Sequence, residues 1–156
     1  MRFCKFFILF SILTFQSNSS FGGNEPSDSL FNISYQLYKA HNYKAALQIC
    51  GNVKAQNQAE MAACELIKGF VFTDSLSFDE GKRWFLKAAT HLRGSTNFKF
   101  IGKVYFGLGK GYYNNAQYLE SIQEFLKLEK LAIAHRMKAE EKSANFYLAE
   151  DFQALH

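Results

Sequence analysis

Aromatic, small and polar residues follow one another in the same order at three places along the chain. The stretches are residues 38–50 (YKAHNYKAALQIC), 72–85 (FTDSLSFDEGKRWF) and 112–125 (YYNNAQYLESIQEF). Aligned on the aromatics Tyr43, Phe78 and Tyr118, each has a small residue three positions later and a bulkier one seven positions later. Apolar positions spaced by three, four and seven residues lie on one face of an α-helix. The pattern therefore predicts a helix in each of these stretches.

An earlier helix is predicted in front of each of these three. Small residues stand nine positions before the aromatic, at Ser34, Gly69 and Gly109. The intervening segments KAHN, TDSLS and YNNAQ are rich in Asn, Ser and Asp, which bond to nearby backbone in turns. Small residues in both helices let them approach closely. Since one helix pair cannot bury its own apolar face, we expect several such units to stack.

These units resemble the tetratricopeptide repeat (TPR) family, which has large, small and aromatic residues at set places in a helical hairpin. The matching positions are Leu30, Ile33, Ser34, Leu37, Tyr43, Ala46 and Cys50; Gly69, Phe72, Phe78, Gly81, Phe85 and Ala88; and Tyr105, Leu108, Gly109, Tyr112, Tyr118, Ser121, Phe125 and Leu128. The resemblance implies an all-α fold, a right-handed superhelical solenoid of antiparallel helix pairs. The later spacing of 40 residues is similar to that of arrays in exported or membrane-bound bacterial signalling and scaffold proteins. Lys68 stands where leucine is usual, which leaves the unit boundaries open.

We expect this repeat domain to cover residues 23–156, with units at about 28–57, 58–97 and 98–137. A terminal helix is expected at about 141–155, because Leu148, Ala149 and Phe152 repeat the positions of Leu108, Gly109 and Tyr112. That helix either caps the solenoid or begins another unit of a longer array.

The first 22 residues have the three parts of a signal peptide. Arg2 and Lys5 precede a ten-residue apolar run at 6–15, and small residues follow it. The run is short for a membrane span, which needs about 20 apolar residues, and no later stretch is long enough. We expect an exported chain, periplasmic or secreted. The alternative is an uncleaved signal that holds the chain at the membrane.

Charge and local motifs give no support to several functional classes. The formal net charge is +4, and it falls to +2 once residues 1–22 and their two cations are removed, which argues against nucleic-acid binding. The stretch GLGKGYY at 107–113 lacks the order of a phosphate-binding loop, and its periodicity places it in a helix. The histidines show no metal-ligand spacing, and no serine lies in G-x-S-x-G. We expect no enzyme activity, no metal and no cofactor.

The TPR resemblance also implies a concave groove lined by the first helix of each unit. Aromatics flanked by lysines at such positions suit an extended or helical peptide with apolar anchors, and packing against neighbouring helices is the alternative role for each residue. The groove residues are Phe31, Tyr35, Tyr38, Lys39, Leu66, Phe70, Lys103, Phe106, Lys110 and Tyr113. The resulting hypothesis is an exported scaffold that binds a protein or peptide; the alternative is a sensor or regulatory N-terminal piece of a longer signalling protein.

Two cysteines remain after the predicted signal, Cys50 and Cys64. Each lies seven residues from position 57, inside the turn between the first two units, so they should sit at the same height on facing helices. An oxidising compartment would allow a disulfide between them. The alternative is a pair of small buried hydrophobic residues.

Overall fold

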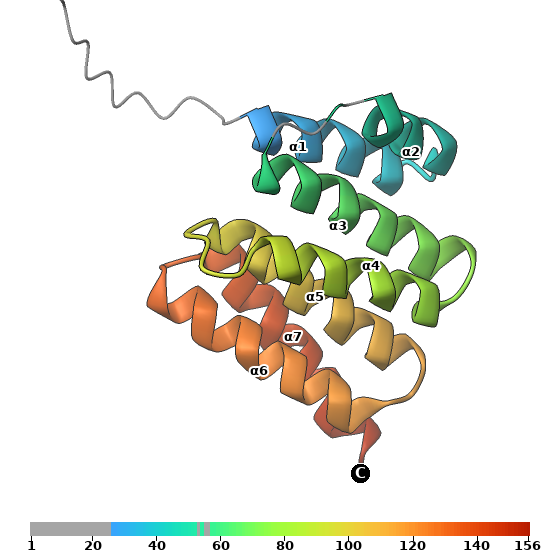
Figure 1. Ribbon diagram of the computed structural model, residues 1–156. Coiled ribbons are helices and arrows are strands. Elements are labelled where there is room, and N and C mark those ends of the chain that lie inside the picture. The colour runs from blue at the N-terminus through green and yellow to red at the C-terminus, as the bar shows by residue number, and fades with distance from the viewer. Residues whose placement is uncertain (1–25, 53, 55–56) are drawn as a thin grey trace, which may run out of the picture.

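The computed structural model describes residues 26–52, 54 and 57–156 (Figure 1), so the predicted signal peptide at 1–22 lies outside the described residues. The described residues form seven helices and no strand, which confirms the predicted all-α class. The helices are α1 (Pro26–Lys39), α2 (Tyr43–Asn52), α3 (Gln58–Ser75), α4 (Phe78–His91), α5 (Phe98–Asn114), α6 (Tyr118–Ala134) and α7 (Lys138–Ala154).

The repeated aromatics mark the start of a helix each time. Helices α2, α4 and α6 begin at Tyr43, Phe78 and Tyr118. The Ser77 hydroxyl caps α4 by accepting from the Glu80 amide at 3.3 Å, and the Asn42 side chain accepts from the Ala45 amide at 3.3 Å. In two of the three predicted turns, polar side chains therefore satisfy amides that the first helical turn leaves unpaired, whereas α6 has no side-chain cap.

Three of the turns share one backbone geometry. His41, Ala116 and Arg136 have φ of 57°, 56° and 55°, and each lies two residues before the next helix. In each turn the amide of this residue and the following amide bond to carbonyls in the last turn of the preceding helix. This left-handed closing residue ends helices frequently. It reverses the chain within three residues after α1, α5 and α6.

The helices contact one another in a recurring order (Figure 1). Helix α1 packs on α2, α3 on α4 and α5 on α6, and each of α2, α4 and α6 also packs on the helix that follows it. Helices α1, α3, α5 and α7 contact each other in sequence. The result is a stack that runs from α1 at one end to α7 at the other.

Small residues bring the paired helices together at the predicted places. A Cβ added at Gly69 would lie 2.6 Å from the Phe85 ring, and one at Gly109 would lie 2.9 Å from the Phe125 ring. In the first pair, the Ser34 hydroxyl lies 3.9 Å from the Cys50 sulfur. The residue nine positions before each repeated aromatic thus meets the residue seven positions after it.

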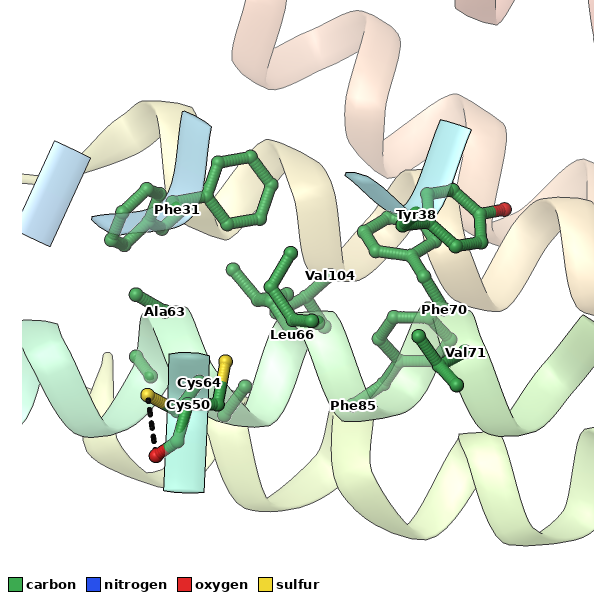
Figure 2. Close-up of a cluster of buried hydrophobic side chains, with 14 of the residues drawn as sticks. Phe31, Tyr38, Cys50, Ala63, Cys64, Leu66, Phe70, Val71, Phe85 and Val104 are labelled. Atoms are coloured by element: carbon green, nitrogen blue, oxygen red, sulfur yellow. Dashed lines mark hydrogen bonds between the residues drawn. The ribbon is translucent and has the colours of Figure 1, made fainter. Parts of the chain in front are cut away.

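Two hydrophobic clusters hold the stack. The larger joins α1 to α5, and Figure 2 shows part of it, with Leu66 between Phe31 on one side and Phe70 on the other, and Phe70 packed on Phe85. The smaller consists of Phe125, Leu128, Ala144 and Leu148 and fastens α7 to α6. Helix α7 is therefore attached through a separate and smaller apolar contact.

The face that α7 buries differs from the sequence expectation. Ala149 and Phe152 were expected to repeat the packed positions Gly109 and Tyr112, yet both are exposed, while Asp151 is buried. The reason is that α7 has neighbours only on the side of α5 and α6 among the described residues. Within the same residues, no helix is long and apolar enough to cross a membrane.

Candidate protein-binding surface

Four of the ten predicted groove residues belong to the core. Phe31, Tyr38, Leu66 and Phe70 are each at most 7% exposed. The Phe31 ring of α1 meets the Phe100 ring of α5, 5.2 Å between centroids, and the Tyr38 ring packs on Phe70 of α3 at 5.5 Å. Side chains from α1 and α5 therefore close over α3. In this conformation these four side chains pack within the protein, the alternative role weighed for them.

The other six groove residues keep part of their side chains at the surface. Lys39 is exposed, and partial exposure is shared by Tyr35, Lys103, Phe106, Lys110 and Tyr113. Four of these six come from α5 and one each from the middle and the end of α1. The accessible part of the predicted groove is thus centred on α5.

Tyr147 of α7 extends this surface and is not among the predicted groove residues. Its ring stacks on the buried Phe125, with centroids 4.7 Å apart and planes at 3°. It also contacts Phe106 at 5.8 Å and Tyr113 at 5.6 Å. Phe106, Tyr147 and Tyr113 therefore form a continuous partly exposed run of rings, called here the aromatic run. The predicted groove ended at Tyr113. The signal that could have located Tyr147 is the 40-residue spacing, because Phe146, its neighbour, lies 40 positions after Phe106.

Lysines border the aromatic run. Lys103 Nζ lies 3.5 Å from Glu140 Oε1 and 5.9 Å from the ring centroids of both Tyr35 and Phe106. Its charge is therefore shared between a carboxylate and two ring faces. Lys110 forms no salt bridge with any described residue. Its ammonium is available to an acidic group of a partner.

Tyrosine hydroxyls at the edge of this surface are hydrogen-bond donors. Tyr38 donates to Asp74 Oδ2 at 2.8 Å, and Tyr113 donates to Glu150 Oε2 at 3.3 Å. Burial, followed by the hydrogen bond to Asp74, raises the pKa of Tyr38, and burial also raises the pKa of Tyr147. These phenols stay protonated at neutral pH, so the rings act as neutral contact surfaces.

The two cysteines are buried side by side with free thiols (Figure 2). Cys64 Sγ donates to the backbone carbonyl of Cys50 at 3.7 Å, and Cys50 Sγ donates to the Ser34 hydroxyl. The neighbouring Cys50 side chain, followed by burial, raises the pKa of Cys64. The structure brings the pair together, and the disulfide between them stays a prediction.

The part of the chain that the structure describes contains no group of side chains suited to a metal ion, and its glycine-rich stretch has a packing role. No group of three or more His, Cys, Asp or Glu side chains is placed to hold a metal ion there. The glycines of 107–113 lie inside α5, where Cβ atoms at Gly107 and Gly111 would collide with the rings of Phe85 and Phe78. These glycines serve helix packing.

Comparison of the chain with protein-family models, with curated proteins and with solved structures gives no match.

Proposed function

We propose that the chain is an exported, TPR-like scaffold that binds a protein or peptide on the face formed by its first helices. A solenoid of antiparallel pairs is supported by the helix contacts described above, in which α1, α3, α5 and α7 follow one another and α1, α3 and α5 each pack on the next helix. The right-handed twist is what the TPR resemblance implies. Export rests on the signal-peptide pattern of residues 1–22.

The aromatic run is the observation that carries this proposal. Phe106, Tyr113 and Tyr147 are partly exposed, and the Tyr147 ring contacts both of the others. Lys103 lies 5.9 Å from the Phe106 ring centroid, and Lys110 follows Phe106 by four positions and precedes Tyr113 by three, which places it on the same face of α5. Aromatic rings give a large contact area at a low cost in side-chain entropy, so they dominate many binding surfaces. Neighbouring lysines favour a partner segment that combines apolar anchors with acidic residues.

The proposed partner segment is shorter than the full groove would accept. Because Phe31, Leu66 and Phe70 are buried, the surface offered by α1 and α3 is reduced to Tyr35 and Lys39. Binding is therefore concentrated on α5 and α7. A short helix or an extended peptide fits such a surface.

Selection from a displayed peptide library tests the proposal, using Lys110→Glu and the matched control Lys130→Glu. Both variants make the same change of charge, and Lys130 is an exposed residue of α6 without a salt bridge to any described residue. Peptides selected on the wild type should be acidic and aromatic or aliphatic, and Lys110→Glu should weaken them about tenfold or more. Equal affinities for the two variants would refute the placement of the site.

A regulatory role in a longer signalling protein is the alternative, and one feature favours it. Helix α7 exposes Phe146 and Phe152 at 58% and 51%, and Leu155, directly after it, is 47% exposed. Phe106 and Tyr112, in the same register of α5, are partly buried. Sequencing of the transcript beyond codon 156 tests this alternative, which requires an open reading frame there.

A further inference from the structure

A buried carboxylate joins α7 to α5 and α6. The Asp151 side chain is 0% exposed and lies in the last turn of α7. Its Oδ2 is 2.7 Å from the Ser121 hydroxyl oxygen of α6, and that oxygen is 3.1 Å from the Gly109 carbonyl oxygen of α5. One chain of three polar groups thus crosses the three helices.

The two contacts among these three polar groups need two protons if both are hydrogen bonds. With an ionised aspartate, only the Ser121 hydroxyl proton is present. A serine hydroxyl has a single proton, so Ser121 donates either to Asp151 or to the Gly109 carbonyl. With an ionised carboxylate, one of the two short contacts joins two acceptors without a proton between them. With a protonated carboxyl group, Asp151 donates to Ser121 and Ser121 donates to Gly109. Both distances are then hydrogen bonds.

The surroundings of Asp151 also disfavour a negative charge. Burial raises the pKa of Asp151, and the hydrogen bond with Ser121 lowers it in part. Its Oδ1 has no hydrogen-bond partner among the described residues. The end of a helix carries a partial negative charge, which adds to the cost of a carboxylate in the last turn.

The ionisable groups around this corner offer no compensating cation. Tyr113 of α5 interacts electrostatically with Glu150 and Asp151, which both lie on α7, and with Tyr118 of α6. Tyr147 also lies on α7. Within the described part of the chain, no lysine, arginine or histidine is among the influences on Asp151. A carboxylate here would be buried beside neutral phenols and a second carboxylate.

We propose that the docking of α7 is linked to a proton, with Asp151 protonated and donating to Ser121 in the docked state. Detachment of α7 returns the carboxyl group to water, where it ionises. Docking is therefore fully favoured below the ordinary carboxyl pKa of about 3.9. It weakens as the pH rises from there through the higher pKa of the docked state, and the loss is constant above that.

This linkage gives the protein a pH-sensitive end. Helix α7 is held by the small cluster of Phe125, Leu128, Ala144 and Leu148, so a modest electrostatic cost matters to its attachment. Tyr147 moves with it, because its ring lies on α7. If the aromatic run binds a partner, as proposed above, low pH completes the binding surface, and a rise in pH through the docked-state pKa of Asp151 loosens it.

Two measurements on the full-length chain test the linkage without any ligand, so their outcome is independent of the proposed function. Carbon-13 NMR follows the Asp151 carboxyl group across pH 3–9, with Asp151→Asn to assign the signal. Hydrogen exchange of the α7 amides, corrected for the intrinsic rate, follows detachment over the same range. Glu141→Gln is the matched control, since it neutralises another α7 carboxylate, one that forms no salt bridge with any described residue.

We expect the Asp151 carboxyl group to titrate above about 3.9. The opening constant of α7 should rise about tenfold for each pH unit between that value and the measured pKa. Asp151→Asn should remove this dependence and Glu141→Gln should retain it. Titration at or below the ordinary value, or the same pH dependence in wild type and Asp151→Asn, would overturn the proposal. If Asp151→Asn does not fold, through-bond correlation of the carboxyl carbon to the Asp151 backbone assigns the signal, and the wild-type titration then decides the question.

Discussion

Gly81 is the glycine at which an added methyl group should lower the free energy of unfolding most. A Cβ there would collide with the Thr73 hydroxyl and would lie 2.7 Å from the Gly69 carbonyl oxygen and 2.8 Å from the Thr73 amide nitrogen. The last two are backbone atoms of α3, which cannot turn aside as a side chain can. Gly81→Ala therefore forces α3 and α4 apart.

The magnitude follows from three contributions. Overpacking of a tight contact costs about 1–3 kcal/mol, and backbone neighbours place this site near the upper limit. The Thr73 hydroxyl donates to the Gly69 carbonyl at 2.8 Å, and its displacement costs about 1 kcal/mol. Replacing a helical glycine by alanine returns at most about 1 kcal/mol. The net loss is about 2–3 kcal/mol of unfolding free energy.

Thermal unfolding followed by far-ultraviolet circular dichroism measures this loss. A decrease of about 6–10 °C in Tm is expected for a domain of this size. Gly51→Ala is the matched control, because an added Cβ at Gly51 has no atom within 4 Å. The control should raise Tm by about 2 °C, since only the helix propensity changes near the end of α2. A Tm for Gly81→Ala at or above the wild-type value would refute the close-contact argument.

Two further predictions concern side chains that join neighbouring helices. Exposure of the purified chain to oxidised glutathione should convert Cys50 and Cys64 to one disulfide and stabilise the fold by about 2–4 kcal/mol; two alkylatable thiols after this treatment, counted by mass spectrometry, would contradict the prediction. Tyr38→Phe removes the 2.8 Å hydrogen bond to Asp74 between α1 and α3 and should lower the unfolding free energy by about 1 kcal/mol, measured in urea. An unchanged urea midpoint would show that this bond contributes nothing.

The repeat pattern was sufficient to locate the helices, because turn chemistry and close contacts are local. Tyr43, Phe78 and Tyr118 open their helices as the alignment indicated, and Gly69 and Gly109 meet the rings that lie sixteen residues further on. The last helix begins at Lys138, slightly before the expected start near 141. Spacing cannot resolve such a difference where no capping side chain marks the first turn.

The binding surface could be predicted only in part, because it depends on the curvature of the whole stack. The contact of Phe31 with Phe100 joins residues 69 positions apart, and no periodicity within one unit reveals it. Together with the packing of Tyr38 on Phe70, that contact leaves four of the ten predicted groove residues buried. The burial of Asp151 could not be predicted for a related reason. A charged residue next to Glu150 is typical of a solvated face, and only the packing of α7 on its neighbours shows that the Asp151 side chain is buried.

The contact between α1 and α5 has a mechanical consequence. In a stack where each unit contacts only its neighbours, the resistance to stretching depends on each unit and each neighbouring interface separately. Here the Phe31–Phe100 ring pair and the 3.4 Å salt bridge from Lys99 to Asp28 span the whole width of α3 and act as a cross-brace. Under tension, helices α1 to α5 would therefore yield together and not one unit at a time.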